Sequence, residues 1–329
     1  MEIAASSGQL AGSSAEVAGA AAERAGISPA LIKSLSKRST WRALAAVALQ
    51  WAIIVGCAVL AQRSGSYLAA FLAIVVIATR QHALLVLMHD AAHYSLSNSK
   101  GLNDFVARLF LAFPFSVSMK RYRVNHLAHH QHVNEAVDPD LEDNIAPQTV
   151  PELAKLVLSD LFFLAVPKAL RRSRKFGVLG IFRESGEGWW TERTTYLVFA
   201  LAVAVAAAYF DLWGMLFFYW LVPMFSFLQV ILRLRGYSEH AGRMTEQTEV
   251  GKSRTIDVGP VERFLFAPYN VNRHLEHHLY PSIPFFNLER AHVELTTRPG
   301  VFDTFKPSEG YFGAAVSPRT VFGELYRHA

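Results

Sequence analysis

The chain has 329 residues, of which 52% are hydrophobic and 18% charged, and its 32 Lys and Arg exceed its 27 Asp and Glu by a net charge of +5. This composition is too apolar for a disordered or fibrous protein, and the small positive excess forms no basic stripe with interleaved aromatic residues, so nucleic acid is not an expected partner. The single cysteine, Cys57, excludes an intrachain disulfide, a Cys-ligated zinc site and an iron–sulfur cluster built from this chain alone, so any metal would be held by His, Asp or Glu.

The chain begins with a segment rich in Ala, Ser and Gly that has neither the basic start nor the unbroken apolar core of a signal peptide. We predict that residues 1–38 form a flexible N-terminal tail on the cytoplasmic side. Residues 39–329 are then expected to form a single membrane domain.

Four apolar stretches follow that are long enough to cross a bilayer as helices. The first, residues 41–62, carries only Arg42 as a charge and would extend about 33 Å, enough for a hydrocarbon core of roughly 30 Å. Residues 67–88 return across the membrane. A second pair, residues 194–210 and 212–232, is separated only by Asp211, and Pro223 predicts a kink in the last helix.

Lysine and arginine flank these spans on one side, at Lys33, Lys37, Arg38 and Arg42, within residues 120–175, and at Arg233 and Arg235. The two opposite loops hold only Arg63 and Asp211 as charged residues. The positive-inside rule therefore places both termini and the long central segment in the cytoplasm, with the chain in the inner or plasma membrane if it is bacterial. The sequence predicts an all-α integral membrane fold with four transmembrane helices and a cytoplasmic helical cap over residues 89–193 and 233–329.

Eight of the 13 histidines fall in three short windows, which are His89 and His93; His126, His129 and His130; and His274, His277 and His278. Positions i, i+3 and i+4 share one face of a helix, so helical windows would each present their imidazoles in one direction. The predicted topology puts all three windows on the same side of the membrane. We therefore expect them to meet at one histidine-rich site inside the cap.

Eight imidazoles are too many for one ion but suit two ions with four or five nitrogens each, and His240 is a ninth candidate. Imidazole binds zinc, copper, iron and nickel alike. The absence of HExxH excludes a helical zinc protease, the lone cysteine excludes a nucleobase deaminase, and only Glu289 and His292 provide the ExxH pair of a carboxylate-bridged di-iron bundle. A binuclear, all-histidine iron site remains, while His292 and His328 are expected to be ordinary surface residues.

At these residues the sequence resembles the membrane fatty acid desaturase family, which carries HxxxH, HxxHH and HxxHH boxes on a four-span scaffold. The similarity extends to Tyr122-Arg-Val-Asn-His126, to Asp138-Pro-Asp140 and to the stretch from His274 to Pro284, and it covers about residues 40–295. The resemblance implies an oxygen-dependent enzyme with two iron ions and O2 as cosubstrate. Such an enzyme takes electrons from a separate donor and removes two hydrogens from adjacent carbons of an apolar chain.

The resemblance implies that the catalytic, metal-ligating residues are His89, His93, His126, His129, His130, His240, His274, His277 and His278. In the stearoyl-CoA branch of the family, an asparagine one turn before the residue matching His240 reaches an iron through water. Gly236 occupies that place here. Asn270 and Asn272 are the residues that could complete the iron shell instead.

Three further features distinguish which branch of the family the sequence resembles. The first box has three residues between its histidines, which is closer to acyl-lipid, sphingolipid or carotenoid-modifying relatives than to the acyl-CoA branch. The third box begins with His274 rather than the Gln of front-end desaturases, and no cytochrome b5 His-Pro-Gly-Gly motif occurs. The implied electron donor is therefore a separate protein of the ferredoxin or cytochrome b5 type.

Nearby acidic residues are expected to accept the second imidazole N–H of the ligands and to orient them, namely Asp90, Asp138, Asp140, Glu239 and Glu276. The Asp138-Pro-Asp140 motif is equally well explained as a turn.

The expected function is O2-dependent desaturation of an acyl chain in a lipid. The alternatives are a carotenoid hydroxylase or ketolase, a desaturase of a small amphiphile such as an amino-acid enol-ether precursor, and a non-catalytic metal-binding membrane protein.

Overall fold

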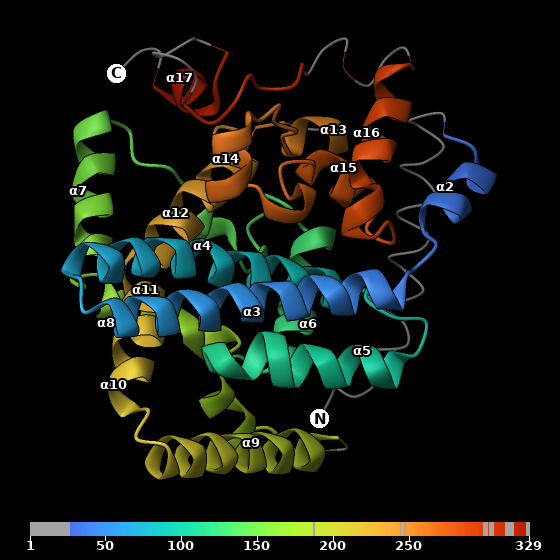
Figure 1. Ribbon diagram of the computed structural model, residues 1–329. Coiled ribbons are helices and arrows are strands. Elements are labelled where there is room, and N and C mark those ends of the chain that lie inside the picture. The colour runs from blue at the N-terminus through green and yellow to red at the C-terminus, as the bar shows by residue number, and fades with distance from the viewer. Residues whose placement is uncertain are drawn as a thin grey trace.

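The computed structural model describes residues 27–186, 188–243, 245–246, 248–298, 302, 306–312 and 319–326 (Figure 1). Within these residues the regular elements are helices, and the only β-type pairing is two isolated bridges, Val117 with Gly177 and Ile256 with Ser308. The predicted all-α fold is confirmed.

The elements of the first half are α2 (Pro29–Leu35), α3 (Thr40–Ser64), α4 (Tyr67–Ala92), α5 (Lys100–Val106), the π-helix η1 (Ala107–Ala112), the 3-10 helix η2 (Phe113–Phe115), α6 (Met119–Gln131), η3 (Leu141–Asp143), α7 (Val150–Leu161), α8 (Val166–Arg172), η4 (Ser173–Lys175) and η5 (Val178–Phe182). The second half contains α9 (Trp189–Tyr209), α10 (Trp213–Leu216), the π-helix η6 (Phe217–Leu221), α11 (Val222–Phe225), α12 (Phe227–His240), α13 (Glu249–Lys252), α14 (Pro260–Leu265), η7 (Pro268–Asn270), α15 (His274–Leu279), η8 (Phe285–Asn287), α16 (Leu288–Thr296) and α17 (Val321–Leu325).

Four helical segments are long and apolar enough to cross a membrane, and they confirm the four predicted spans. They are Thr40–Ser64, Tyr67–Ala92, Trp189–Tyr209 and Trp213–His240. The last continues well beyond residue 232, where the apolar pattern ends, because Ser238, Glu239 and His240 are buried against protein. A hydropathy pattern identifies the apolar part of a helix and does not detect buried polar residues that continue the same helix.

The fourth span is broken near Pro223, as predicted. The π-helix η6 ends just before the short helix α11, which has Pro223 in its first turn. Ser226 then adopts φ −124 and ψ −98, outside the helical region, before α12 begins. Proline cannot donate the helical hydrogen bond and its ring crowds the preceding turn, so the chain changes direction here.

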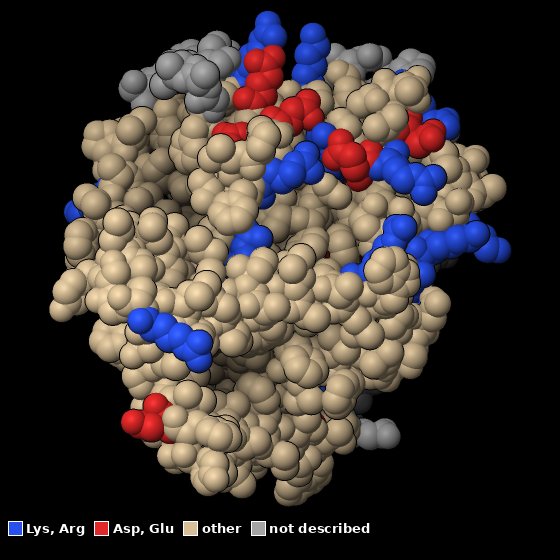
Figure 2. Space-filling model, viewed as in Figure 1, with Lys and Arg blue, Asp and Glu red and all other residues tan. Residues whose placement is uncertain are grey.

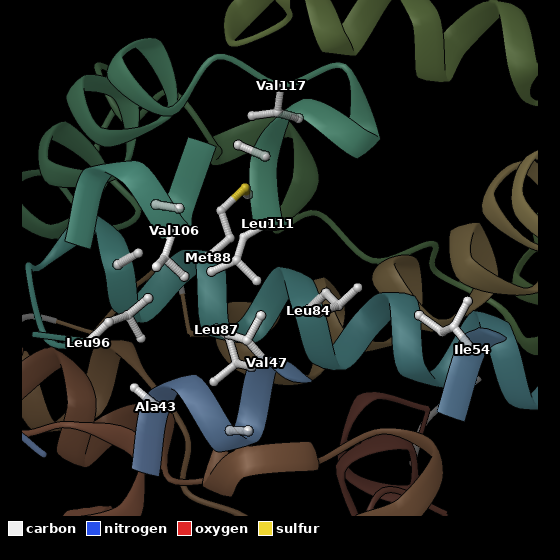
Figure 3. Close-up of a cluster of buried hydrophobic side chains, with 14 of the residues drawn as sticks. Ala43, Val47, Ile54, Leu84, Leu87, Met88, Leu96, Val106, Leu111 and Val117 are labelled. Carbon is white, nitrogen blue, oxygen red and sulfur yellow. The ribbon is translucent and has the colours of Figure 1, made fainter. Parts of the chain in front are cut away.

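Helices α3 and α4 run side by side and anchor the first histidine window. Figure 3 shows their buried side chains, among them Val47, Leu84 and Leu87, packed with Leu111 from η1. Ala43 and Ala46 on α3 are small, which lets the two helices approach closely. The C-terminal end of α4, with His89, is therefore buried inside the protein.

The flexible tail expected over residues 1–38 is wrong for its last part. Pro29–Leu35 forms α2, capped by the Ser28 side chain, and Ile27 and Leu35 are only 3% and 1% exposed. Both pack against the buried cluster that includes Leu288 and Leu295, and Asn287 Nδ2 donates to the Leu35 carbonyl at 2.7 Å. The helix forms because apolar residues recur at helical spacing after a Ser-Pro start. Residues 1–26 lie outside the described residues.

Helices α13 to α17 gather on one side of the α3–α4 pair in Figure 1, while α9 lies at the opposite edge of the molecule. Figure 2 shows most charged side chains of this face over the part where α13 to α17 lie, and few over the part formed by α9. Only 11% of the apolar window of α9 is buried in the protein. This distribution suits a chain whose lower part faces lipid and whose α13–α17 segment faces water.

Candidate metal centre

The three histidine windows lie at three helices, as their spacing predicts. His89 is in the last turn of α4, and His93 is the residue that caps this helix. The second window lies in the last two turns of α6, and the third window makes up most of the short helix α15. His240 is the last residue of α12.

The structure brings all nine predicted residues together in two groups. One group consists of His89, His93, His126, His130 and His277, and the other of His129, His240, His274 and His278, with one nitrogen from each ring within 4.8 Å of the others in its group. The second and third windows each contribute to both groups, since His129 turns away from His126 and His130. The two groups thus share α6 and α15, while α4 contributes only to the first group and α12 only to the second.

Within each group, several pairs of Nε2 atoms lie about 3 Å apart. In the first group, the Nε2 atoms are 2.8 Å apart for His93 and His126, and 3.1 Å apart for both His126–His130 and His130–His277. In the second group, the separation is 2.9 Å for His274–His240 and 3.0 Å for His278–His274. Nitrogens bound to one metal ion at about 2.1 Å and at right angles to one another lie about 3 Å apart, so these separations fit ligands that share an ion.

The tautomers of His129 and His240 point to the same conclusion. His129 Nδ1 lies 2.9 Å from Asp138 Oδ1, and His240 Nδ1 lies 3.0 Å from the carbonyl oxygen of Lys252. Both oxygens are acceptors, so both Nδ1 atoms carry hydrogen, and each ring in its neutral form presents a lone pair at Nε2. These two Nε2 atoms face each other at 3.2 Å. A cation among the four nitrogens of this group would satisfy all of them at once.

Burial keeps most of these imidazoles neutral. It lowers the pKa of His126, His130 and His274 well below the usual value, and neighbouring rings lower these pKa values further. The pKa values of His277 and His278 are lowered for the same reasons. His129 differs, because the hydrogen bond and charge of Asp138 outweigh burial and raise its pKa. Neutral imidazole is the form that binds metals.

Two of the five predicted acidic partners lie beside a predicted ligand. Asp138 is bonded to His129, and Glu239 Oε1 lies 3.4 Å from His274 Nδ1 while Arg235 Nε donates to the same oxygen at 2.6 Å. Asp138 is thus both part of a turn and a partner of a predicted ligand.

The expectation is wrong for Asp90, Asp140 and Glu276. Asp90 accepts the Phe285 N–H at 2.9 Å, and Glu276 is bonded to His292. Asp140 is bonded to no described histidine. Glu276 follows His274 by two residues, which places it on the opposite face of the helix.

His292 is buried, so its assignment as a surface residue is wrong. It is 7% exposed, and its Nδ1 lies 2.6 Å from Glu276 Oε1. It lies on α16 with the buried residues Leu288, Ala291 and Leu295. That apolar spacing is the signal that could have identified the buried face of this helix. His328 lies outside the described residues.

Of the two asparagines that could complete an iron shell, Asn270 is engaged elsewhere through both side-chain atoms, and Asn272 through Nδ2 alone, because its buried Oδ1 has no partner among the described residues. Asn270 Nδ2 donates to the Phe285 carbonyl and its Oδ1 accepts from Arg263, while Asn272 Nδ2 donates to the Ile256 carbonyl at 2.7 Å. Neither lines the cavity beside the histidines, whereas Gly236 does. At Gly236 the wall of the cavity therefore has no side chain.

A cavity of about 380 Å³ opens onto both histidine groups. Its apolar wall includes Leu85, Phe115, Met224 and Leu228, and its polar wall includes Arg235, Asp140, Asp143 and Asn144. Five of the nine histidines border it, which are His89, His126, His129, His240 and His274. A small molecule in this cavity would touch the candidate metal centre directly.

Comparison with known proteins agrees with these observations. The family model described as fatty acid desaturase matches residues 65–301. The chain is 27% identical over 266 residues to dihydrorhizobitoxine desaturase of Bradyrhizobium elkanii, covering 77% of this chain and 75% of that protein. It is 25% identical over 253 residues to sn-1 acyl-lipid omega-3 desaturase (ferredoxin) of Nostoc sp. (strain 36), covering 69% of this chain and 67% of that protein.

Proposed function

The chain belongs to the fatty acid desaturase family, and on this premise we propose that it is an O2-dependent di-iron desaturase of the membrane. Family membership makes it an oxidoreductase that works with a redox partner. The observation that carries the proposal is the convergence of nine imidazoles into groups of five and four beside one cavity. No single ion needs so many nitrogens, whereas a pair of ions does.

In this proposal each histidine group holds one iron ion. Bound iron would supply the reductive activation of dioxygen, for which zinc has no accessible redox step. The protein's own residues hold and orient that centre. Asp138 keeps the Nδ1 proton of His129 in place, so that the Nε2 lone pair points inward.

The cavity would orient the substrate and exclude bulk water from it. Its apolar wall suits an aliphatic chain, and its position beside the histidines brings the chain to the metal pair. In net terms, two hydrogens leave adjacent carbons, and dioxygen with two electrons from the donor and two protons becomes two waters.

The substrate that the family implies is an acyl chain of a lipid, and the name of the Nostoc relative agrees with this. A small amphiphile is the second candidate. The name of the Bradyrhizobium relative, dihydrorhizobitoxine desaturase, and the charged residues Arg235 and Asp140 in the cavity wall favour it. A ferredoxin or cytochrome b5 type protein is the proposed electron donor.

We place the site and both termini on the cytoplasmic side of the membrane. The support is the concentration of lysine and arginine on the side where α4 and α12 end, against a single Arg63 and Asp211 in the opposite loops.

Product analysis tests the proposed reaction. Lipids and polar metabolites from cells that express the chain should contain a product two hydrogens lighter than its precursor, and cells that express His277→Ala should lack it. A product that retains oxygen from dioxygen would contradict desaturation and would favour the hydroxylase or ketolase alternative. Stoichiometric metal binding without any new product would favour a non-catalytic metal-binding protein.

A further inference from the structure

Arg235 lines the cavity and has two guanidinium nitrogens without a hydrogen-bond partner among the described residues. Its side chain is 14% exposed, and its Nε donates to Glu239 Oε1 at 2.6 Å. Its Nη1 and Nη2 donate to no residue within the described part of the chain, and Arg235 lines the cavity. It precedes His240 by five residues on α12, which is about 7.5 Å along the helix axis.

Two other arginines with little exposed side chain, Arg233 and Arg273, are paired more completely, whereas the buried Arg254 has an Nη1 with no partner among the described residues. Arg233, two residues earlier, places both Nε and Nη2 on Asp160 and Nη1 on Tyr237. Arg273 bonds Glu289 through Nε and Nη2, and Asp257 through Nη1. A guanidinium presents a planar fork that matches a carboxylate, and it is costly to bury without partners. The free fork of Arg235 therefore points to an anionic group in the ligand.

Asp140 supplies the opposite charge in the same cavity. It comes from the loop after α6, and its carboxylate accepts no hydrogen bond from any residue that the structure describes. The carboxylate also makes no ion pair with Arg235 within those residues. Arg235 keeps its ion pair with Glu239, and its charge is not paired with Asp140. Opposite charges that line one cavity without pairing with each other are complementary to a ligand that carries both charges.

We propose, on the basis of the proposed desaturase function, that the substrate is a small zwitterionic amphiphile whose carboxylate binds Arg235 and whose ammonium group binds Asp140. Its aliphatic part lies along the apolar wall, and its reacting carbons lie a few bonds from the charged end, because Arg235 and the histidine groups border the same small cavity. A lipid acyl chain, whose polar head is remote from the reacting carbons, leaves both charges unused.

Binding measured without turnover tests this inference. The probes are octanoate, methyl octanoate, octylamine and 2-aminooctanoate, titrated by calorimetry into the oxidised, iron-loaded full-length protein with no electron donor present. Octanoate should bind at least about tenfold more tightly than its methyl ester, as a charged, bidentate contact implies, and 2-aminooctanoate should bind most tightly of the four. Equal affinities for the acid and the ester would overturn the inference.

Three variants assign the charges, and the iron content of each is measured first. Arg235→Gln should abolish the preference for acid over ester and leave the affinity for methyl octanoate unchanged, and Arg235→Lys should keep part of the preference. Asp140→Asn should abolish the advantage of 2-aminooctanoate over octanoate only. If Arg235→Gln loses iron, the difference in affinity between octanoate and methyl octanoate for the unaltered protein still tests the inference.

The outcome is separable from that of the proposed function. Discrimination among the probes without any double-bond formation would count against the desaturase proposal alone. Desaturation of acyl lipids by a protein that binds acid and ester equally would count against this inference alone.

Discussion

His129 and Asp138 form a contact of 2.9 Å between Nδ1 and Oδ1 in which the carboxylate is itself fixed by the backbone. Asp138 accepts the N–H of Asn134 through Oδ2 at 2.9 Å and that of Asp140 through Oδ1 at 2.8 Å. The turn around Pro139 therefore orients the carboxylate, the carboxylate orients the imidazole, and the imidazole presents Nε2 to the second histidine group.

Substitution of Asp138 should weaken metal binding without removing a ligand. In Asp138→Ala the Nδ1 proton of His129 loses its acceptor, and partners of this kind contribute about 10- to 100-fold to metal affinity. Iron retention during dialysis against a chelator measures the effect. Glu142→Gln is the matched control, because Glu142 is exposed in the neighbouring helix η3. Equal retention in both variants would show that the Asp138 contact has no role at the metal.

Loss of a grouped histidine should differ sharply from loss of its neighbour in the sequence. His129→Ala and His277→Ala should abolish desaturation and lower the iron content, since each removes one nitrogen from a group. His132→Ala is the control, because His132 belongs to neither group and its side chain is 42% exposed, paired with Glu135. Full turnover by His277→Ala, or an equal loss in His132→Ala, would contradict the ligand assignment.

The packing of α2 should be measurable as stability. Leu35→Ala removes a fully buried side chain from the cluster with Leu288 and Leu295, at an expected cost of about 2–5 kcal/mol in unfolding free energy. Lys33→Ala changes an exposed residue of the same helix and should have little effect. Thermal unfolding in detergent compares the two variants. Identical unfolding would mean that α2 does not contribute to the folded domain.

Acidification should destabilise the metal-free protein. Burial lowers the pKa of His93 to about 3, against an ordinary value of 6.5. Between these values the unfolded chain binds more protons than the folded one, so stability is present above about pH 6.5 and is lost as the pH falls. The slope is roughly 1.4 kcal/mol per pH unit for each such ring. Unfolding temperatures of the metal-free protein between pH 7 and 4 measure this loss of stability. An unfolding temperature that rises on acidification would contradict the assignment of buried neutral rings.

The sequence predicted features that depend on short-range pattern. The four spans follow from runs of apolar residues, and the helical windows follow from the i, i+3, i+4 spacing of residues such as His126, His129 and His130. Both patterns involve residues close together in the sequence, so they indicate a helix regardless of what the helix packs against. The kink at Pro223 is local for the same reason.

Features that depend on packing between distant segments were missed. Nothing in the windows indicates that His129 joins His240 while His130 joins His277, because this division is set by how α6, α12 and α15 meet. The burial of His292 depends on how α16 packs against α15, where its Nδ1 contacts Glu276. The burial of Leu35 depends on Asn287 and Leu295, which lie far along the chain.

The most direct test of the account is the metal content and Mössbauer spectrum of the full-length protein purified from iron-supplied cells. We predict two iron ions per chain in distinct nitrogen-rich sites, with His240→Ala losing the ion of the four-histidine group before the other. A protein that binds only zinc, or a single iron ion unaffected by His240→Ala, would contradict the account.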